Sequence, residues 1–194
     1  NFRENYLEPA LDEGLIQMKY PDSPHHPKQR YLLSGPGVSL QKALKKMETW
    51  GNIDLLKLEK TAFLCSQKGP AAIVLKSYDW AKEQRELGNC IVCGNHSQIE
   101  KDVFEILIKG DQPLILMLAR SMKARWEPEI EKAVEKGRLL VLSPFDPNVK
   151  RVSRATAEKR NREMIGICDR IVVGHITTGG QLDKLLNGRQ HEKI

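Results

Sequence analysis

From residue 61 onward, short runs of apolar residues alternate with longer stretches in which apolar residues recur at helical spacing. The runs are strand-sized and nearly continuous, which is typical of strands buried on both faces. Strands that alternate with helices pair in parallel, because each helix returns the chain to the same end of the sheet. The predicted fold is α/β, a doubly wound, mostly parallel, Rossmann-like sheet with helices on both faces. The predicted strands are residues 61–66, 89–94, 113–120, 138–143 and 170–175, and the predicted helices are 70–87, 98–110, 127–137, 154–168 and 181–186.

The first 34 residues have a different pattern. Residues 3–13 place apolar side chains at helical spacing, and residues 15–20 and 30–33 have the pattern of two strands joined by the proline-rich loop PDSPHHPKQ. Helix, strand, loop and strand make up the second half of a winged helix. The segment LEPALDEGLIQMKYPDSPHHPKQRYLLS also resembles the terminal winged-helix segment of Fic-type and ATP-dependent helicase-related proteins. Such a segment contacts DNA or mediates packing or dimerisation, and the sequence leaves both roles open.

Three segments are therefore predicted. Residues 1–34 form a partial winged helix, 35–60 a linker with amphipathic helices, and 61–194 the Rossmann-like domain. The linker begins with SGPGVS, and the helices are predicted from apolar residues at helical spacing in 41–60. The chain opens with Asn-Phe-Arg, so we expect it to be part of a longer protein.

Composition points to a folded protein with a locally basic surface. The 194 residues hold 31 Lys and Arg against 25 Asp and Glu, a formal net charge of +6, and 40% are hydrophobic. That apolar content supports a packed core and excludes a disordered basic tail. Residues 150–162 carry six cations and one acid, so the expected partner is polyanionic. No apolar run reaches the ~20 residues of a membrane span, so we expect a cytoplasmic protein with no membrane partner.

The four cysteines, Cys65, Cys90, Cys93 and Cys168, all lie inside apolar segments. Reduced core thiols explain this placement better than a disulfide framework does. Cys90 and Cys93 have CxxC spacing, but no second pair and no zinc-type histidine spacing accompany them. We therefore expect neither a metal site nor a redox role.

The residues that follow each predicted strand are the candidates for ligand binding, because the ligand crevice of an open parallel sheet lies beyond the carboxyl ends of its strands. Glycines, hydroxyls and cations at these ends suit a phosphate, which backbone N–H groups and helix dipoles attract. G-x-G-x-x-G and G-x-x-x-x-G-K-[ST] are both absent, which disfavours hydride transfer and P-loop chemistry, so no cofactor is expected. The candidate phosphate or nucleic-acid residues are Ser66, Lys68, Gly94, His96, Ser97, Arg120, Lys150, Arg151, Arg154, Arg160, Asn161, Arg162, Thr177, Thr178, Gly179 and Gly180.

The basic stretch 150–162 is predicted to be a nucleic-acid track. It follows a strand at the ligand edge, and it is rich in arginine, which binds phosphate bidentately and stacks on bases. Aromatic residues make up only 6% of the chain, so electrostatics should dominate and binding should weaken steeply with salt. An alternative role for Arg160 and Asn161 is structural, with Asn161 fixing the pocket loop.

Three motifs, in chain order, resemble the DprA/Smf family of DNA-processing, or DNA recombination-mediator, proteins. They are GNHSQIEKDVFEILIKGDQPLILMLAR, EKGRLLVLSPF and ATAEKRNREMIGICDRIVVGHITTGGQLDKL, and the resemblance covers about residues 60–187. It implies a Rossmann domain whose pocket is lined by Arg160-Asn161, the turn at 94–97 and the Thr-Gly-Gly loop. It also implies single-stranded DNA as partner, loading of a RecA-type recombinase in DNA uptake or recombination, and a homodimer. The turn at 94–97 is shorter than the family's GIDxxAH element, and the winged helix precedes the Rossmann domain where family members usually carry it behind.

A rival interpretation is a nucleotide-binding or nucleotide-processing Rossmann protein, such as a LOG-type phosphoribohydrolase or a nucleotide sensor. The LOG signature is P-G-G-x-G-T followed by a glutamate, and residues 178–183 lack its second glycine, its threonine and its glutamate. Glu100 and Asp102 are the carboxylates nearest the predicted pocket, but no second catalytic group stands at fixed spacing from them. We therefore expect no catalytic residue, and the sequence leaves open whether the ligand is a DNA strand or a nucleotide.

Overall fold

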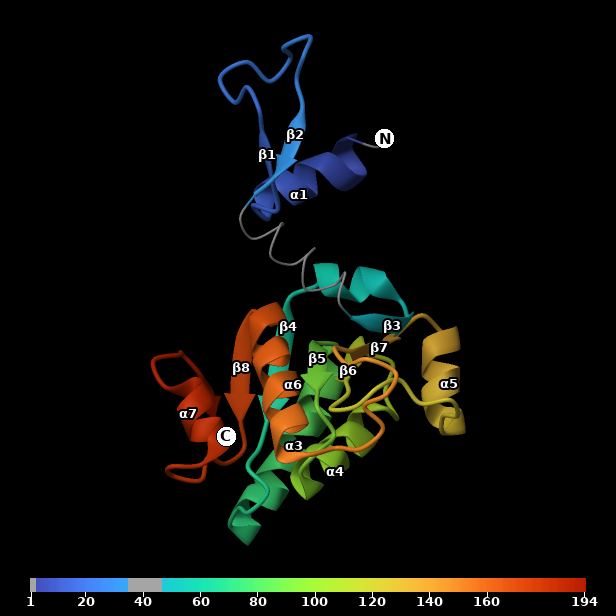
Figure 1. The fold of residues 1–194 in the computed structure, drawn as a ribbon, viewed down its shortest axis with the longest axis vertical. Helices are drawn as coiled ribbons and strands as arrows, with labels where there is room; N and C mark the ends of the chain where they lie inside the picture. Colours follow the sequence, from blue (N-terminus) through green and yellow to red (C-terminus); the bar gives the residue numbers. More distant parts are fainter. Residues whose placement is uncertain (1–2, 35–46) are drawn as a thin grey trace. The chain divides into compact units, whose positions relative to one another are not determined.

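The computed structural model describes residues 3–34 and 47–194. The chain divides into two compact units, Asn1–Lys46 and Met47–Ile194 (Figure 1). In neither of the described ranges is a helix long and apolar enough to span a membrane.

The described part of the smaller unit, residues 3–34, contains a short helical segment and a β-hairpin, as predicted. Gly14, at φ 65°, ends the helical segment in the left-handed region that favours glycine. The two strands pair antiparallel, with Gln17 opposite Leu32. The elements are η1 (Arg3–Leu7), α1 (Glu8–Asp12), β1 (Ile16–Met18) and β2 (Tyr31–Leu33).

The centre of the larger unit is one seven-stranded sheet. Its strands are β3 (Glu48–Gly51), β4 (Lys60–Leu64), β5 (Cys90–Cys93), β6 (Leu114–Met117), β7 (Leu139–Ser143), β8 (Arg170–Val173) and β9 (Glu192–Lys193). Their order is β3-β7-β6-β5-β4-β8-β9, and every neighbouring pair except β3 with β7 is parallel. The prediction of a mostly parallel, Rossmann-like sheet is confirmed.

Each predicted helix after residue 61 is present within a few residues of its expected bounds. Ser97 and Ser153 begin two of them as N-caps, each in a capping box with the residue three positions on. Gly88, at φ 75°, ends the longest. The helices are α3 (Ala71–Leu87), α4 (Gln98–Leu107), α5 (Pro128–Glu135), α6 (Arg154–Ile167) and α7 (Gln181–Leu186).

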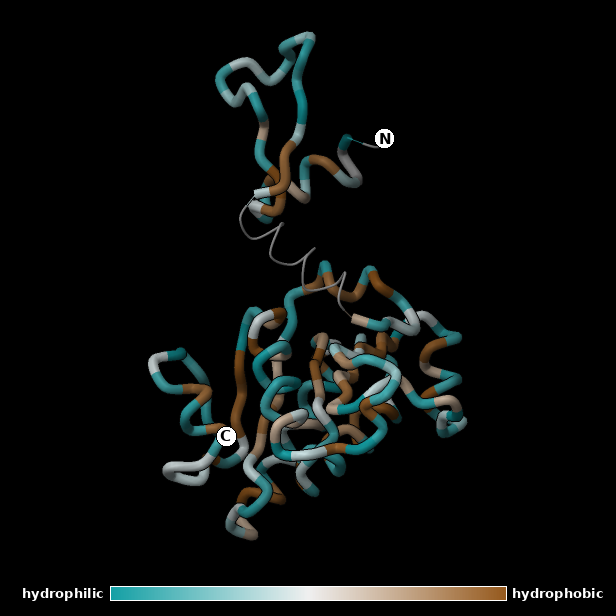
Figure 2. Tube along the Cα trace, viewed as in Figure 1, coloured by the Kyte–Doolittle hydropathy of each residue, from teal (hydrophilic) through white to brown (hydrophobic). Residues whose placement is uncertain are grey.

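Helices cover both faces of this sheet. On one face, Phe63, Ile91 and Leu116 pack in a single hydrophobic cluster with residues of α3, α4 and α5, such as Val103. The alternate strand residues lie outside that cluster and are buried on the opposite face, where α6 contacts β4. Figure 2 shows the central strands among the most hydrophobic stretches of the chain, as burial on both faces requires.

Residues 48–57 differ from the predicted amphipathic helices. They form the antiparallel edge strand β3, with Trp50 opposite Val141 of β7, followed by the 3-10 turn η2 (Ile53–Lys57). Without β3, β7 would be the edge strand and would leave its outer backbone groups unpaired. The pairing of β3 with β7 satisfies these groups, and this tertiary interaction outweighs the helical periodicity of the sequence. At Gly51, a Cβ would lie 2.2 Å from the Leu139 carbonyl oxygen, so the close approach of the two strands requires glycine. The remainder of the predicted helices, 41–46, lies outside the described residues.

Candidate nucleic-acid interface

The carboxyl ends of β4, β5 and β8 meet at one edge of the sheet. β4 lies between β5 and β8, so the order of the strands reverses there, and this reversal marks the usual ligand crevice of open α/β sheets. A cavity of about 330 Å³, named here the switch-point pocket, lies at this edge. Its lining residues are Cys65, Ser66, Gln67, Lys68, His96, Glu100, Arg154, Ala157, Arg160, Asn161, Thr177, Gly180, Gln181 and Leu182.

Glu100 joins the end of β4 to the turn after β5. The side chain is buried, and its Oε1 accepts a hydrogen bond from the N–H of Cys65 at 3.1 Å. Its Oε2 accepts from the N–H groups of His96 at 2.9 Å and Ser97 at 3.2 Å. The Ser97 hydroxyl accepts from the N–H of Glu100 at 3.1 Å, which completes the capping box. With three backbone donors on its two oxygens, Glu100 fixes the geometry of both turns.

Arg160 carries its guanidinium into the interior of this edge, and its exposed fraction is 0%. A Cβ at Gly94 would lie 1.0 Å from Arg160 Nη1, so the guanidinium fills the space that a side chain at position 94 would need. Nη2 lies 3.7 Å from Glu100 Oε2, which is an ion pair but too long for a hydrogen bond. Within residues 3–34 and 47–194, no acceptor reaches any of the three guanidinium nitrogens. Buried donors without acceptors are costly, and this arrangement suits an incoming anion.

The buried charges also shift the pKa values of their neighbours. Burial lowers the pKa of Arg160, while the charge of Glu100 opposes that change. Burial and then the positive charge of Arg160 lower the pKa of His96, so the neutral ring is favoured. The ring Nε2 lies 2.9 Å from Gln67 Nε2, a distance at which a neutral ring accepts from the amide. Burial raises the pKa of the Cys65 thiol to about 11, so this thiol carries no charge at neutral pH.

The turn after β8 closes the pocket against the turn after β4. The Ser66 N–H donates to the His175 carbonyl at 2.9 Å, and the Thr177 N–H donates to the Ser66 hydroxyl at 3.1 Å. The Thr177 hydroxyl reaches the Lys68 carbonyl at 3.4 Å. At Gly180, a Cβ would lie 2.7 Å from the Thr177 carbonyl oxygen, so the loop turns too tightly there for a side chain. These contacts hold the Thr-Thr-Gly-Gly loop at the pocket.

The basic stretch does not form one exposed track. Arg154 and Arg162 are exposed, whereas Arg160 is buried over Gly94, because residues two apart on a helix point to nearly opposite sides. Arg162 forms an ion pair with Glu158 at 3.1 Å, while Arg154 lines the switch-point pocket. The predicted track therefore divides into one interior arginine and separate surface cations.

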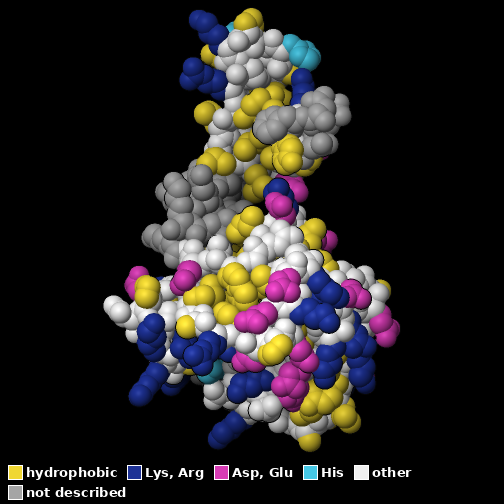
Figure 3. All heavy atoms as spheres, turned by 90° about the vertical axis from the view of Figure 1, so that its right-hand side faces the viewer, with side chains coloured by type: hydrophobic (Ala, Val, Ile, Leu, Met, Phe, Trp, Pro, Cys, Tyr) yellow, Lys and Arg dark blue, Asp and Glu magenta, His cyan; other side chains and the backbone are white. Residues whose placement is uncertain are grey.

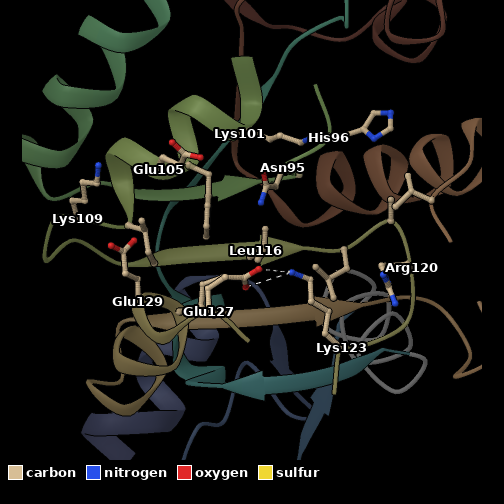
Figure 4. Close-up of a pocket in the computed structure, with 17 residues that line it drawn as sticks. Asn95, His96, Lys101, Glu105, Lys109, Leu116, Arg120, Lys123, Glu127 and Glu129 are labelled. Carbon is tan, nitrogen blue, oxygen red and sulfur yellow. Dashed lines mark hydrogen bonds and ion pairs between the residues drawn. The ribbon is translucent and has the colours of Figure 1, made fainter. Parts of the chain in front are cut away.

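A second cavity, of about 520 Å³, lies beyond the carboxyl end of β6 and is named here the β6 pocket. Its floor is apolar and includes Phe104, Leu116 and Ile130, all nearly fully buried. Charged side chains from α4, α5 and the β6–α5 loop surround the floor (Figure 4). Within this rim, Lys123 pairs with Glu127 at 3.1 Å.

The two pockets share one wall. His96 lines both of them, and Figure 4 shows its ring pointing away from the other labelled side chains of the β6 pocket. Gly94, over which the Arg160 guanidinium lies, lines the β6 pocket, while Arg160 lines the switch-point pocket. The turn at 94–97 therefore separates the two cavities, with Arg160 behind it.

The structure brings half of the predicted site residues together and distributes the others. Ser97 is buried as the cap of α4, and the Gly179 N–H donates to Asp183 Oδ2 at 2.8 Å. Thr178 lines a third cavity, of about 560 Å³, beside α7. Lys150, Arg151 and Arg162 are on the surface and line none of these three cavities. The predicted residues in the switch-point pocket are Ser66, Lys68, His96, Arg154, Arg160, Asn161, Thr177 and Gly180, and those in the β6 pocket are Gly94, His96 and Arg120.

Several lining residues were not among the predicted ones. Gln67 lies between the predicted residues Ser66 and Lys68, so the rule that selected residues after each strand could have selected it as well. Lys101 lies on α4 and Lys109 in the turn just after it, and nothing in the sequence shows that both line a cavity with residues of α5. No group of three or more His, Cys, Asp or Glu side chains suited to a metal occurs in the described part of the chain.

Comparisons with known proteins bear on both units. Residues 1–34 match the family model described as the C-terminal domain of filamentation induced by cAMP protein Fic-like, in agreement with the resemblance noted for this segment. No curated protein sequence matches the chain significantly. DNA processing protein A from Helicobacter pylori, whose structure was described for its single-stranded DNA binding mode, superposes with a TM-score of 0.61 at 16% identity, covering 76% of this chain and 70% of that one.

DNA processing protein A (DprA) from Streptococcus pneumoniae superposes with a TM-score of 0.60 at 20% identity, covering 76% of this chain and 54% of that one. This chain thus spans about half the length of the second protein. At such identities the similarity establishes the fold, and it confirms the DprA-like Rossmann fold expected from the three motifs.

Proposed function

We propose that this chain, which has the Rossmann-like fold of DNA processing protein A, binds single-stranded DNA at the switch-point pocket without catalysing a reaction on it. The observation that carries the proposal is Arg160, a fully buried guanidinium for which the described residues supply an ion pair but no hydrogen-bond acceptor. A phosphodiester entering the pocket supplies the missing acceptors in charge-assisted hydrogen bonds. Because Arg160 has no exposed surface, the phosphate must widen the pocket to reach it. The contact between Gln67 and His96 joins two of the lining turns, and the pocket widens there.

The surroundings of Arg160 favour an anion as well. Lys68 and Arg154 are exposed and line the same pocket, so they add positive charge at its rim. Arg154 begins the 14-residue helix α6, whose N-terminal N–H groups and dipole attract negative charge. The lining also includes hydroxyls and amides, and its Glu100 carboxylate already accepts hydrogen bonds from three backbone N–H groups.

A strand is favoured over a lone nucleotide by the cations that continue outside the pocket. Lys150, Arg151 and Arg162 are exposed around α6 and give a longer polyanion further contacts that a mononucleotide cannot make. The H. pylori protein of the same fold was described for binding single-stranded DNA. On the resemblance of the three motifs alone, we infer as part of the same proposal a role in DNA uptake, processing or recombination, with a RecA-type recombinase and a second copy of the chain as partners. The order helix, strand, loop and strand supports residues 1–34 as a partial winged helix.

One observation supports a second candidate function. At about 330 Å³ the switch-point pocket lies within the ~300–1,000 Å³ range of small-molecule sites, which is compatible with a single nucleotide. The alternative is therefore a nucleotide sensor or nucleotide-processing protein that holds one base–ribose-phosphate ligand at the same edge.

Fluorescence anisotropy with labelled oligo-dT over a range of salt concentrations, beside thermal shifts with NAD, AMP and ADP-ribose, separates the two. We expect tight, salt-dependent strand binding and no stabilisation by the nucleotides. Arg160→Met and Arg154→Ala should both weaken strand binding, and Arg154, being exposed, has no packing role that would confuse the result. The matched control is Arg170→Ala, which removes a guanidinium at the amino end of β8 and should leave affinity unchanged. Nucleotide stabilisation without strand binding would overturn the proposal.

A further inference from the structure

We infer that the edge strand β3 pairs with β3 of a second copy of this chain, so that the seven-stranded sheets of two molecules join into one across a twofold axis. The inference assigns a surface to the second copy that the proposed function includes, and it does not depend on DNA binding. β7 and β6 separate β3 from β5, so this edge is distinct from the switch-point pocket.

The outer backbone groups of β3 are open at Thr49. The Asn52 N–H donates to the Leu139 carbonyl at 3.2 Å, which continues the antiparallel ladder between β3 and β7. Because the bonding direction alternates along a strand, residue 50 directs its N–H and C=O toward β7, and Thr49 directs its own away from the sheet. Thr49 is exposed, and within residues 3–34 and 47–194 no hydrogen bond involves its N–H or its carbonyl. One donor and one acceptor are thus unpaired at this edge.

β3 also lacks the features that keep an edge strand from pairing. Edges are usually protected by lysine, proline, a very short strand or a covering element. The opposite edge of the same sheet follows this rule, because β9 has two residues, Glu192 and Lys193, and both are charged and exposed. β3 has four residues, ETWG, and Glu48 is the single charged one among them. Of the two edges, β3 is therefore the one open to another strand.

The sequence of β3 is complementary to itself in one register. A twofold axis through Thr49 places the two Thr49 residues opposite each other, and the N–H of each then donates to the carbonyl of the other. In this register Glu48 lies opposite Trp50 of the second copy, so no like charges are directly opposite. An axis through Gly51 would instead bring Glu48 toward Asp54 of the second copy, which is unfavourable. The axis through Thr49 is therefore the favoured one.

Apolar surface beside β3 adds to the backbone pairing. The rings of Trp50 and Trp126 lie with their centroids 5.1 Å apart, and both side chains are only partly buried. In the favoured register the two Trp50 side chains are diagonal neighbours on one face of the joined sheet, a separation that aromatic rings can bridge. Ile53, which is 46% exposed, begins η2 directly after β3. Figure 3 shows hydrophobic side chains grouped among charged ones on the side that carries α5, and burial of such a group stabilises a dimer.

Light scattering of the whole chain after gel filtration, over a range of protein concentrations, measures the association. We expect a dimer whose dissociation constant rises roughly tenfold or more in Thr49→Pro, because proline removes the N–H on which both reciprocal hydrogen bonds depend. Proline is tolerated at an edge position whose N–H faces outward, so the variant should still fold. The matched control is Thr49→Val, which keeps the N–H and should dimerise as the wild-type protein does.

Two further variants locate the axis. Thr49→Lys and Thr49→Glu each place like charges opposite each other, so each alone should dissociate more readily than the wild-type protein. An equal mixture places lysine opposite glutamate in the mixed dimer and should restore association. Restoration requires position 49 of one copy to face position 49 of the other, which pairing at a different surface does not provide. If Thr49→Pro fails to fold, this pair of variants still gives the answer.

A dimer that none of the position 49 variants weakens would overturn the inference and leave the second copy at another surface. Variants that are weakened but do not recover on mixing would contradict the axis through Thr49 and, with it, the inference. A wild-type protein that stays monomeric at every concentration would overturn both the inference and the second copy in the proposed function, and would leave β3 open to a strand of a different protein. The oligo-dT titrations decide DNA binding separately in each case.

Discussion

The contact between Gly94 and Arg160 can be tested with a single methyl group. In Gly94→Ala the new Cβ would lie 1.0 Å from Nη1 and 2.0 Å from Cζ of Arg160, and an ordinary contact begins at 3.4 Å, so the guanidinium must retreat by about 2.4 Å. A flexible arginine on the surface would do this at little cost, but Arg160 is 0% exposed. Overpacking of this kind costs ~1–3 kcal/mol in the free energy of unfolding. Gly94 has no positive φ, so alanine adds no backbone strain.

The cost should depend on Arg160, which a double-mutant cycle measures. In an Arg160→Ala background the obstructing guanidinium is gone, so Gly94→Ala should cost well under ~1 kcal/mol, leaving a coupling energy of ~1–3 kcal/mol. Urea unfolding followed by tryptophan fluorescence is the assay, since Trp50, Trp80 and Trp126 all belong to the larger unit and report on it alone. An equal cost of Gly94→Ala in both backgrounds would refute the packing argument.

Three further outcomes are expected. Arg154→Ala should reduce the slope of log affinity against log salt for oligo-dT by ~0.7, one single-strand phosphate contact, and an unchanged slope in anisotropy titrations would remove Arg154 from the interface. The pKa of His96 is lowered in the folded state, so as pH falls through 6.5, the ordinary pKa of histidine, the unfolded state takes up a proton first. Stability should therefore decline below that pH, and less steeply in His96→Gln. Urea unfolding between pH 7.5 and 5.5 measures this decline. Burial raises the pKa of Cys65 and of Cys90 to about 11, so both should react with iodoacetamide at pH 8 only after unfolding, and mass spectrometry that finds them labelled in the native protein would contradict their burial.

The sequence predicted the sheet because its signals are local. Strands such as β5 and β7 are nearly continuous apolar runs that are buried at every position in the structure. The Ser97 and Ser153 caps lie where the helical spacing begins. The position of the ligand edge followed from the topology rule, since residues after parallel strands must meet.

What the sequence did not reveal depends on contacts between distant segments. Trp50 lies in a strand because β7, some ninety residues later, offers an open edge. Arg160 sits in a basic stretch typical of a surface, and its burial depends on the missing side chain at Gly94. The β6 pocket needs α4 and α5 to face each other across β6, which no local pattern encodes.

The pairing of β3 with β7 has a consequence for synthesis. β3 ends at Gly51, and the β7 residues it pairs with begin at Leu140. At ~5–20 residues per second, the partner emerges about 4 to 18 s after β3 has left the ribosome. Meanwhile β4, β5 and β6 can align in the order in which they are made, whereas the first strand of the domain waits for the fifth. The segment around Trp50 is thus among the earliest parts of this domain to be made and among the last to find its partner.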